Sequence, residues 1–186
     1  MILTQRGEVA AEKLKVGDMI RTRDHKLPKL RWLGRRDLGP GDMIAGPHLR
    51  PIRIDRRALG HGLPLENLTV SPWHRLLVPG WRAEMLFGEP EVLVAATHLS
   101  HLPGISRPPA RPVSYFHPLF DQHEPVPFNG RWSESFQPAK RTLKEMDPAQ
   151  RVDLFKKFPA RSGPEINYPA ARATLSAFEA RVLLPQ

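Results

Sequence analysis

The residues best suited to chemistry in this sequence are a serine and a histidine three positions apart, Ser71 and His74. They lie within residues 68–78, a run whose hydrophobic flanks predict a buried strand interrupted at Pro72. At the end of such a strand, an imidazole can give a proton to a peptide nitrogen or take one from a hydroxyl. Two plainer interpretations stay open: Ser71 as a turn hydroxyl before Pro72, and His74 as a buried histidine bonded to the backbone.

The elements that must position this pair are expected to be short strands joined by turns, over residues 2–136. The 21 prolines and 13 glycines among 186 residues favour many turns over long helices. Residues 49–54 alternate hydrophobic and polar side chains, as a half-buried strand does. Asn129-Gly130 is a strong signal for a hairpin turn. The sequence therefore predicts a mainly β fold for this part of the chain.

The composition changes after Phe136, and the remaining residues are expected to be helical. Asp147-Pro148 provides an N-cap and a first-turn proline for one helix. Hydrophobic residues at helical spacing predict a second helix over about residues 169–184. We therefore expect two parts: a β domain of residues 1–136, and a helical C-terminal extension of residues 137–186 packed on it.

The composition also excludes several classes of site. Since the chain has no cysteine, it cannot form disulfides, thiolate zinc sites or a cysteine nucleophile of its own. No hydrophobic run approaches the roughly 18 residues of a membrane span, and the N-terminus lacks the hydrophobic region of a secretion signal. We expect a soluble protein that is cytoplasmic by default, with no cofactor and no membrane partner.

Positive charge is concentrated between Arg21 and Arg57, where 11 Lys or Arg face 4 Asp or Glu. The whole chain carries a formal net charge of +9. Arginine-rich surfaces suit phosphate contacts, so a nucleic-acid surface is one interpretation. The other is the solvated face of a β-meander, which is favoured because no aromatic platform accompanies the charge.

Beyond these local signals, the order of motifs resembles the Hint fold that is shared by hedgehog autoprocessing domains and inteins. The opening motif consists of Ile2, Thr4, Gly7, Leu14, Gly17-Asp18 and Ile20. It is followed at family spacing by Ser71-Pro72-Trp73-His74. A bacterial subgroup of Hint domain proteins is typified by runs similar to residues 49–54, 80–88, 115–124 and 129–136, and by the late helix with Phe178-Glu179-Ala180. The resemblance covers nearly the whole chain.

This resemblance implies self-processing chemistry on the polypeptide that precedes the domain in cis. A Cys or Ser at the first position of the domain attacks the carbonyl before it and exchanges an amide for a thioester or ester. A histidine protonates the departing nitrogen, because an amide nitrogen leaves poorly otherwise. Water, a sterol or another nucleophile then resolves the ester.

The resemblance also implies roles for individual residues. His74 matches the histidine of the central block, and Ser71 stands where the family more often has Thr. His123 matches the histidine of a later block, and His117 lies where inteins often carry Asp. Asp121 is a nearby carboxylate that could orient His123 or His74. Asp121, His123 and Glu124 could instead form a solvated loop. Given convergent geometry, His117, His123 and Asp121 could bind a metal.

Two departures from the family pattern affect the expected activity. The nucleophile should lie several residues before Ile2, where the printed chain offers only Met1. No terminal His-Asn pair follows the last strand, so cleavage by Asn cyclisation is not expected. We therefore expect the chain as printed to be inactive, through a truncated start or a degenerate copy, with His74 close to where the chain enters its first strand. The alternative is a basic, β-rich nucleic-acid-binding or structural module.

Overall fold

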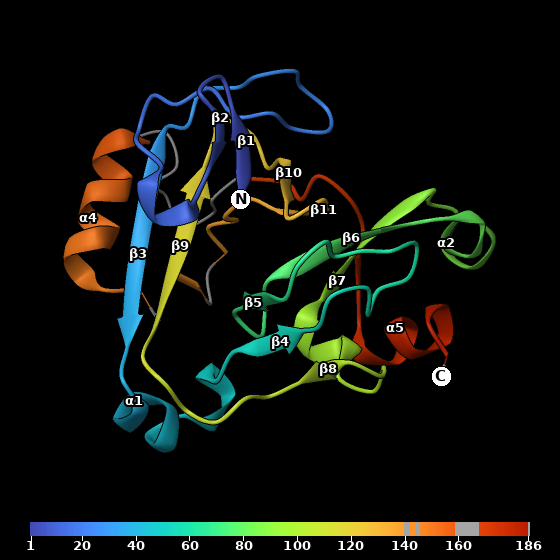
Figure 1. Ribbon diagram of the computed structural model, residues 1–186. Coiled ribbons are helices and arrows are strands. Elements are labelled where there is room, and N and C mark those ends of the chain that lie inside the picture. The colour runs from blue at the N-terminus through green and yellow to red at the C-terminus, as the bar shows by residue number, and fades with distance from the viewer. Residues whose placement is uncertain (140–141, 144–145, 159–167, 186) are drawn as a thin grey trace.

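The computed structural model describes residues 1–139, 142–143, 146–158 and 168–185. Its strands form three sheets, as Figure 1 shows. The largest has seven strands in the order β12-β7-β6-β11-β10-β1-β2. A ribbon of β3 and β9 and a sheet ordered β5-β4-β8 complete the β structure. The expected mainly β fold with a C-terminal helix is confirmed.

The strands are short. Those of the seven-stranded sheet are β1 (Ile2–Thr4), β2 (Gly7–Val9), β6 (Arg75–Pro79), β7 (Glu91–Ala95), β10 (Pro125–Phe128), β11 (Arg131–Glu134) and β12 (Thr174–Leu175). Those of the smaller sheets are β3 (Trp32–Leu38), β9 (Val113–Leu119), β4 (Ile52–Ile54), β5 (Leu68–Val70) and β8 (Ile105–Ser106).

Short helices connect or flank the strands. The α-helices described are α1 (Pro40–Ala45), α2 (Trp81–Phe87), α4 (Pro148–Lys157) and α5 (Ala177–Leu183). The 3-10 turns are η1 (Ala11–Lys13), η2 (Pro47–Leu49) and η3 (Ala96–Leu99). No helix in the described part of the chain has both the length and the apolar character to cross a membrane.

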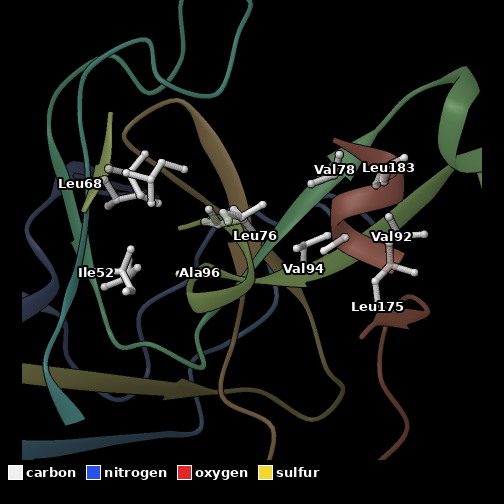
Figure 2. Close-up of a cluster of buried hydrophobic side chains, with 14 of the residues drawn as sticks. Ile52, Leu68, Leu76, Val78, Val92, Val94, Ala96, Leu175 and Leu183 are labelled. Atoms are coloured by element: carbon white, nitrogen blue, oxygen red, sulfur yellow. The ribbon is translucent and has the colours of Figure 1, made fainter. Parts of the chain in front are cut away.

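The main hydrophobic core is built on β6 and β7, whose side chains are almost continuously buried. Strands covered on both faces show such uninterrupted hydrophobic runs rather than alternation. Figure 2 shows how Leu76 and Val94 of these strands lie between Ile52 and Leu68 of the small sheet and Leu183 of the C-terminal helix. The core therefore fixes β6, and with it the turn that precedes this strand.

The hairpin expected at Asn129-Gly130 connects β10 and β11. Both residues have positive φ values, 48° and 78°, which is the geometry of the turn that matches strand twist. A Cβ at position 130 would lie 3.0 Å from atoms of Leu65, so glycine is also required by close packing. The turn sets the register that carries β11 back towards β6.

The C-terminal extension differs from the expected pair of helices. The first helix begins as predicted, because Asp147 accepts hydrogen bonds from the amides of Ala149 and Gln150. The second prediction is wrong in its bounds: β12 extends the large sheet beside β7, and the helix begins only at Ala177. Ser176 and Glu179 form a capping box that starts the helix there.

Side-chain burial explains why the longer helix does not form. Phe178 is 75% exposed, whereas Leu175 of β12 and Leu183 of α5 are buried in the main core. Tyr168 and Leu154 of the extension pack in another core with Trp32 of β3. Figure 1 shows α4 beside the β3–β9 ribbon and α5 at the other side of the molecule. The extension thus joins the cores of the β domain.

Candidate functional site

A cavity of about 580 Å³ lies where the end of β11, the start of β6 and the β9 strand meet. Four of the eight histidines in the chain line it, namely His48, His74, His98 and His117. Thr174 of β12 also lines it, so the C-terminal extension forms part of the wall. Histidine is the side chain best suited to proton transfer near neutral pH.

His74 lies in a tight turn at the edge of this cavity. Its amide donates to the carbonyl of Ser71 at 3.1 Å, and its carbonyl accepts from the amide of Ala96 at 2.9 Å. The backbone is therefore held from both sides. No residue in the described part of the chain hydrogen-bonds the His74 ring, and the ring faces the cavity. An imidazole in this position is available for proton exchange with a ligand.

The electrostatics keep His74 neutral at neutral pH. Burial lowers the pKa of His74 below its ordinary value, and the charges of Arg75 and His123 act in the same direction. Glu134 opposes them, since a carboxylate favours the protonated ring. The neutral ring can accept a proton, and the nearby carboxylate stabilises the cation that results.

Ser71 lines the same cavity, and no described residue hydrogen-bonds its hydroxyl. The structure therefore brings together Ser71 and His74, the pair that spacing had predicted to be close. His117 of β9 also faces the cavity, with its ring centroid 5.0 Å from that of Phe136. Burial, with smaller effects from His74 and Arg36, lowers the pKa of His117 to about 4.

Glu134 is the site residue that sequence reasoning missed. One carboxylate oxygen accepts from the amide of Arg75 at 2.9 Å, and the other lies 2.6 Å from the guanidinium of that residue. His123 Nε2 lies 3.2 Å from the latter oxygen. Burial alone raises the pKa of Glu134, but His123, Arg75 and His74 outweigh it, so the pKa lies below its ordinary value. The only signal for Glu134 in the sequence is a carboxylate beside the hydrophobic Trp132 and Phe136.

His123 lies behind Glu134 and does not line the cavity. Its side chain is 1% exposed. Nδ1 accepts a hydrogen bond from the amide of Ala171 at 2.9 Å, and Nε2 lies 3.2 Å from the carbonyl oxygen of Ser135. The structure thus places His123 next to the site through Glu134, without access to a ligand in the cavity.

Asp121 does not occupy the place expected for it. Its side chain is 68% exposed, and the carboxylate lies 3.3 Å from Arg31. Phe120 before it is fully buried, and Asp121 lies in the bend that follows β9. Asp121 therefore points outwards, and Glu134 is the carboxylate with a described contact to His123.

The residues considered for a metal site lie in three different environments. His117 faces the cavity, His123 is buried behind Glu134, and Asp121 is at the surface. Within the ranges that the structure describes, no group of three or more His, Asp or Glu side chains could hold a metal ion.

The start of the chain does not lie against His74, contrary to expectation. None of residues 1–35 lines the cavity. The Met1 amino group donates to Asn129 Oδ1, at the hairpin end of β10. Strands β10 and β11 separate β1 from β6, because the hairpin is inserted between them. The imidazole faces the cavity, but at a distance from the first strand.

Several basic side chains between Arg21 and Arg57 are paired within the protein. Arg35 and Arg53 each lie 2.8 Å from an aspartate two positions further along the chain. Arg31 pairs with Asp121, and Arg50 donates to a backbone carbonyl at 2.7 Å. Exposed contacts of this kind are typical of a solvated face.

A family model described as a Hint domain matches residues 1–140. That range includes all the residues that line the cavity except Thr142, Met146, Asp147, Gln150 and Thr174. No curated protein and no solved structure matches the chain.

Proposed function

The chain belongs to the Hint domain family, and we propose that it acts as the scaffold of a self-processing reaction whose nucleophile is an upstream Cys or Ser. The observation that carries this proposal is His74. Its ring faces a cavity, no described residue occupies its nitrogens, and its pKa is lowered by burial. A neutral, available imidazole is what an acyl shift requires of its acid–base group.

The proposed reaction moves one acyl group and one proton. The thiol or hydroxyl attacks the carbonyl carbon of the residue before it, and its proton passes to His74. The carbon–nitrogen bond then breaks, and the imidazolium returns the proton to the departing amine. The products are a thioester or ester and a free amino group. In this proposal Ser71, on the same turn, orients the scissile peptide.

Glu134 supports the step in which His74 carries the proton. It is ionised, because Arg75 and His123 outweigh the effect of burial on its pKa. Its charge favours the imidazolium at position 74. The ion pair with Arg75 holds the carboxylate at the end of β11, in the wall of the cavity. Glu134 is therefore a positioning and electrostatic group in this proposal.

The strand register indicates where an upstream nucleophile would have to be. Ile2 pairs with Phe128, Phe128 with Arg131, and Ser133 with Leu76. The start of β1 therefore lies three strands from β6 and about four residues along it from His74. With about 3.3 Å per residue and about 4.8 Å per strand, the separation across a flat sheet is on the order of 20 Å. Six extended residues span about 20 Å.

The test supplies the proposed nucleophile upstream of residues 1–186. A reporter domain and a Cys six residues before Met1 are fused to residues 1–186, and release of the reporter is followed with an added thiol. We expect thiol-dependent release, and His74→Ala should slow it by about a hundredfold or more. His61→Asn is the matched control, because His61 is exposed and its positive φ of 50° suits asparagine.

A second part of the experiment varies the distance between the added Cys and Met1. A Cys only two residues before Met1 cannot reach the cavity, so this variant should release no reporter. Equal release from both positions, equal release from His74→Ala, or no release with the Cys at any position from five to eight residues upstream would refute the proposal.

A further inference from the structure

Glu134 has two partners, and the same late segment of the chain contacts both of them. One partner is His123, whose Nδ1 accepts the hydrogen bond from the amide of Ala171. The other is Arg75, whose guanidinium donates to Thr174 Oγ1 at 2.8 Å. Residues 168–175, which we name the C-terminal clamp, lie outside the range matched by the family model. Their contacts with the site are therefore a feature of this chain beyond the matched domain.

The contact with Ala171 determines which nitrogen of His123 carries the proton. A ring nitrogen that accepts a hydrogen bond is unprotonated, so the neutral ring carries its proton on Nε2. That proton faces the carbonyl oxygen of Ser135 and the carboxylate of Glu134, both at 3.2 Å. Because the side chain is almost fully buried, water cannot replace either partner. Both nitrogens of His123 are engaged, in contrast to those of His74.

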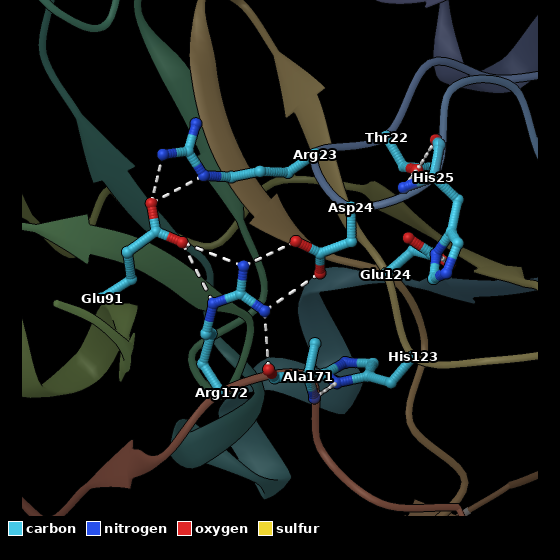
Figure 3. Close-up of polar contacts among 9 residues, drawn as sticks. All are labelled: Thr22, Arg23, Asp24, His25, Glu91, His123, Glu124, Ala171 and Arg172. Atoms are coloured by element: carbon cyan, nitrogen blue, oxygen red, sulfur yellow. Dashed lines mark hydrogen bonds and ion pairs between the residues drawn. The ribbon is translucent and has the colours of Figure 1, made fainter. Parts of the chain in front are cut away.

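The C-terminal clamp is fastened by a network of two arginines and two carboxylates. Figure 3 shows Arg172 between Glu91 and Asp24, with Ala171 directed at His123. Arg172 donates to Glu91 at 3.0 Å and makes two contacts with Asp24, at 3.0 and 2.6 Å. Arg23 donates to the other oxygen of Glu91 at 2.6 Å. The two-pronged geometry of arginine fixes direction as well as position, and it therefore fixes the adjacent amide.

A second set of contacts holds the clamp near Arg75. Gln137 accepts from the Arg75 guanidinium at 2.6 Å and donates to the carbonyl of Tyr168 at 3.0 Å. The Tyr168 hydroxyl donates to the carbonyl of Phe120 at 3.2 Å. The Tyr168 end of the clamp is thus tied to Phe120 and, through Gln137, to Arg75.

We propose that the C-terminal clamp is a positioning element of the site, in which Ala171 holds His123 as the Nε2–H tautomer and Thr174 orients Arg75, so that Glu134 is presented beside His74. The catalytic consequence rests on the proposed function, whereas the tautomer does not. His123 is then a fixed donor to Glu134 and Ser135, and proton transfer is left to His74.

The first test reads the tautomer directly in the full chain. In ¹⁵N-labelled protein at neutral pH, long-range ¹H–¹⁵N spectra distinguish a protonated from an unprotonated ring nitrogen, and His123→Gln assigns the signals. We expect His123 to show one form, with the proton on Nε2. A proton on Nδ1, or an averaged mixture of the two tautomers, would overturn the assignment.

The second test loosens the clamp. Arg172→Ala should convert the single His123 form into a mixture, whereas Arg53→Ala, which removes another arginine–aspartate pair, should leave it unchanged. An unchanged His123 spectrum in Arg172→Ala would contradict the positioning role. If that variant does not fold, Ala171→Pro deletes the donor amide itself and must give the same mixture, with the His101 signals as the check on folding.

The third test connects the clamp to the reaction. In the reporter fusion, Thr174→Val should slow release at least about threefold, and Thr174→Ser should restore it, because serine retains the hydroxyl that accepts from Arg75. Equal rates in Thr174→Val and the parent fusion would refute the link to catalysis. A parent fusion that releases nothing, together with the expected tautomer, would refute the proposed function and leave the clamp assignment in place.

Discussion

The surroundings of His74 and His123 differ in one respect that decides what each ring can do. Both histidines lie near Glu134, and His123 is buried whereas His74 is partly exposed. The His74 ring faces a cavity and has no described hydrogen-bond partner, whereas both nitrogens of His123 are engaged. A ring with a free nitrogen can exchange a proton with a substrate. A ring with none can only hold its neighbours in place.

Glu134 contacts His123 and lies near His74. We expect its removal to cause the largest loss of unfolding free energy. Glu134→Leu leaves the Arg75 guanidinium, 17% exposed, without its ionic partner. Removing one member of a buried pair costs about 3–5 kcal/mol of unfolding free energy. The loss of unfolding free energy is measured by urea unfolding of Glu134→Leu and the parent protein at neutral pH.

Glu134→Gln is the control for this prediction, because the amide oxygen can still accept from the Arg75 amide. It should lose less than half as much stability as Glu134→Leu. Equal losses in the two variants would contradict this expectation. They would show that the carboxylate charge, which both variants remove, stabilises this part of the fold more than the hydrogen bond that glutamine retains.

The two histidines should differ next in their contribution to stability. His123→Phe leaves the Ala171 amide without an acceptor and removes the contact between the His123 ring and Glu134. An unsatisfied buried group costs about 1–3 kcal/mol, so we expect a loss of about 2–3 kcal/mol. His74→Phe removes no described hydrogen bond of the ring and should change stability by less than about 1 kcal/mol. Urea unfolding of His123→Phe and His74→Phe compares the two losses of unfolding free energy. Similar losses would contradict the difference between the hydrogen-bonded ring of His123 and the ring of His74.

The parts of the site that sequence could predict are those encoded within a few residues. Ser71 and His74 are close because a single turn brings them together, and Asn129-Gly130 determines its own hairpin. Hydrophobic runs likewise identified β6 and β7, because strands buried on both faces require them.

The remaining parts depend on contacts between distant segments. Glu134 reaches Arg75 only through the β11–β6 register, and Ala171 reaches His123 across 48 residues. Neither contact has a local pattern. The late helix is a different case, since Ser176 and Glu179 have the spacing of a capping box, which indicates a start at Ala177. Hydrophobic spacing through Phe178 pointed instead to a longer helix with a buried face that does not exist.

A smaller effect is expected on the pH dependence of the unfolding free energy, from His117 in the cavity. The pKa of His117 is about 4 in the folded protein and near 6.5 when unfolded. Between these values the unfolded chain binds more protons, so stability falls as the pH drops from 6.5 towards 4.5 and is unaffected above 6.5. The full shift corresponds to about 3 kcal/mol, and partial exposure of the ring reduces this to about 1–3 kcal/mol.

His117→Phe should flatten that part of the stability curve, because phenylalanine does not titrate and can pack against Phe136. The measurement is urea unfolding at several values between pH 4.5 and 6.5, above the range in which the carboxylates with lowered pKa values protonate. An unchanged slope would place His117 in water in the folded protein.

We expect substitution of Asp121 to have the smallest effect on the unfolding free energy. This variant tests whether Asp121 or Glu134 is the carboxylate that contacts His123. The side chains of Asp121 and Arg31 are 68% and 46% exposed, and their closest atoms are 3.3 Å apart. Exposed pairs of this kind contribute little and are screened by salt. Asp121→Asn should therefore change the unfolding free energy by less than about 0.5 kcal/mol and leave reporter release unchanged. A loss comparable to that of Glu134→Leu, or a His123 spectrum altered in Asp121→Asn but not in Glu134→Gln, would transfer the role of the buried carboxylate to Asp121. The structure argues against that outcome, because the oxygen 3.2 Å from His123 Nε2 belongs to Glu134.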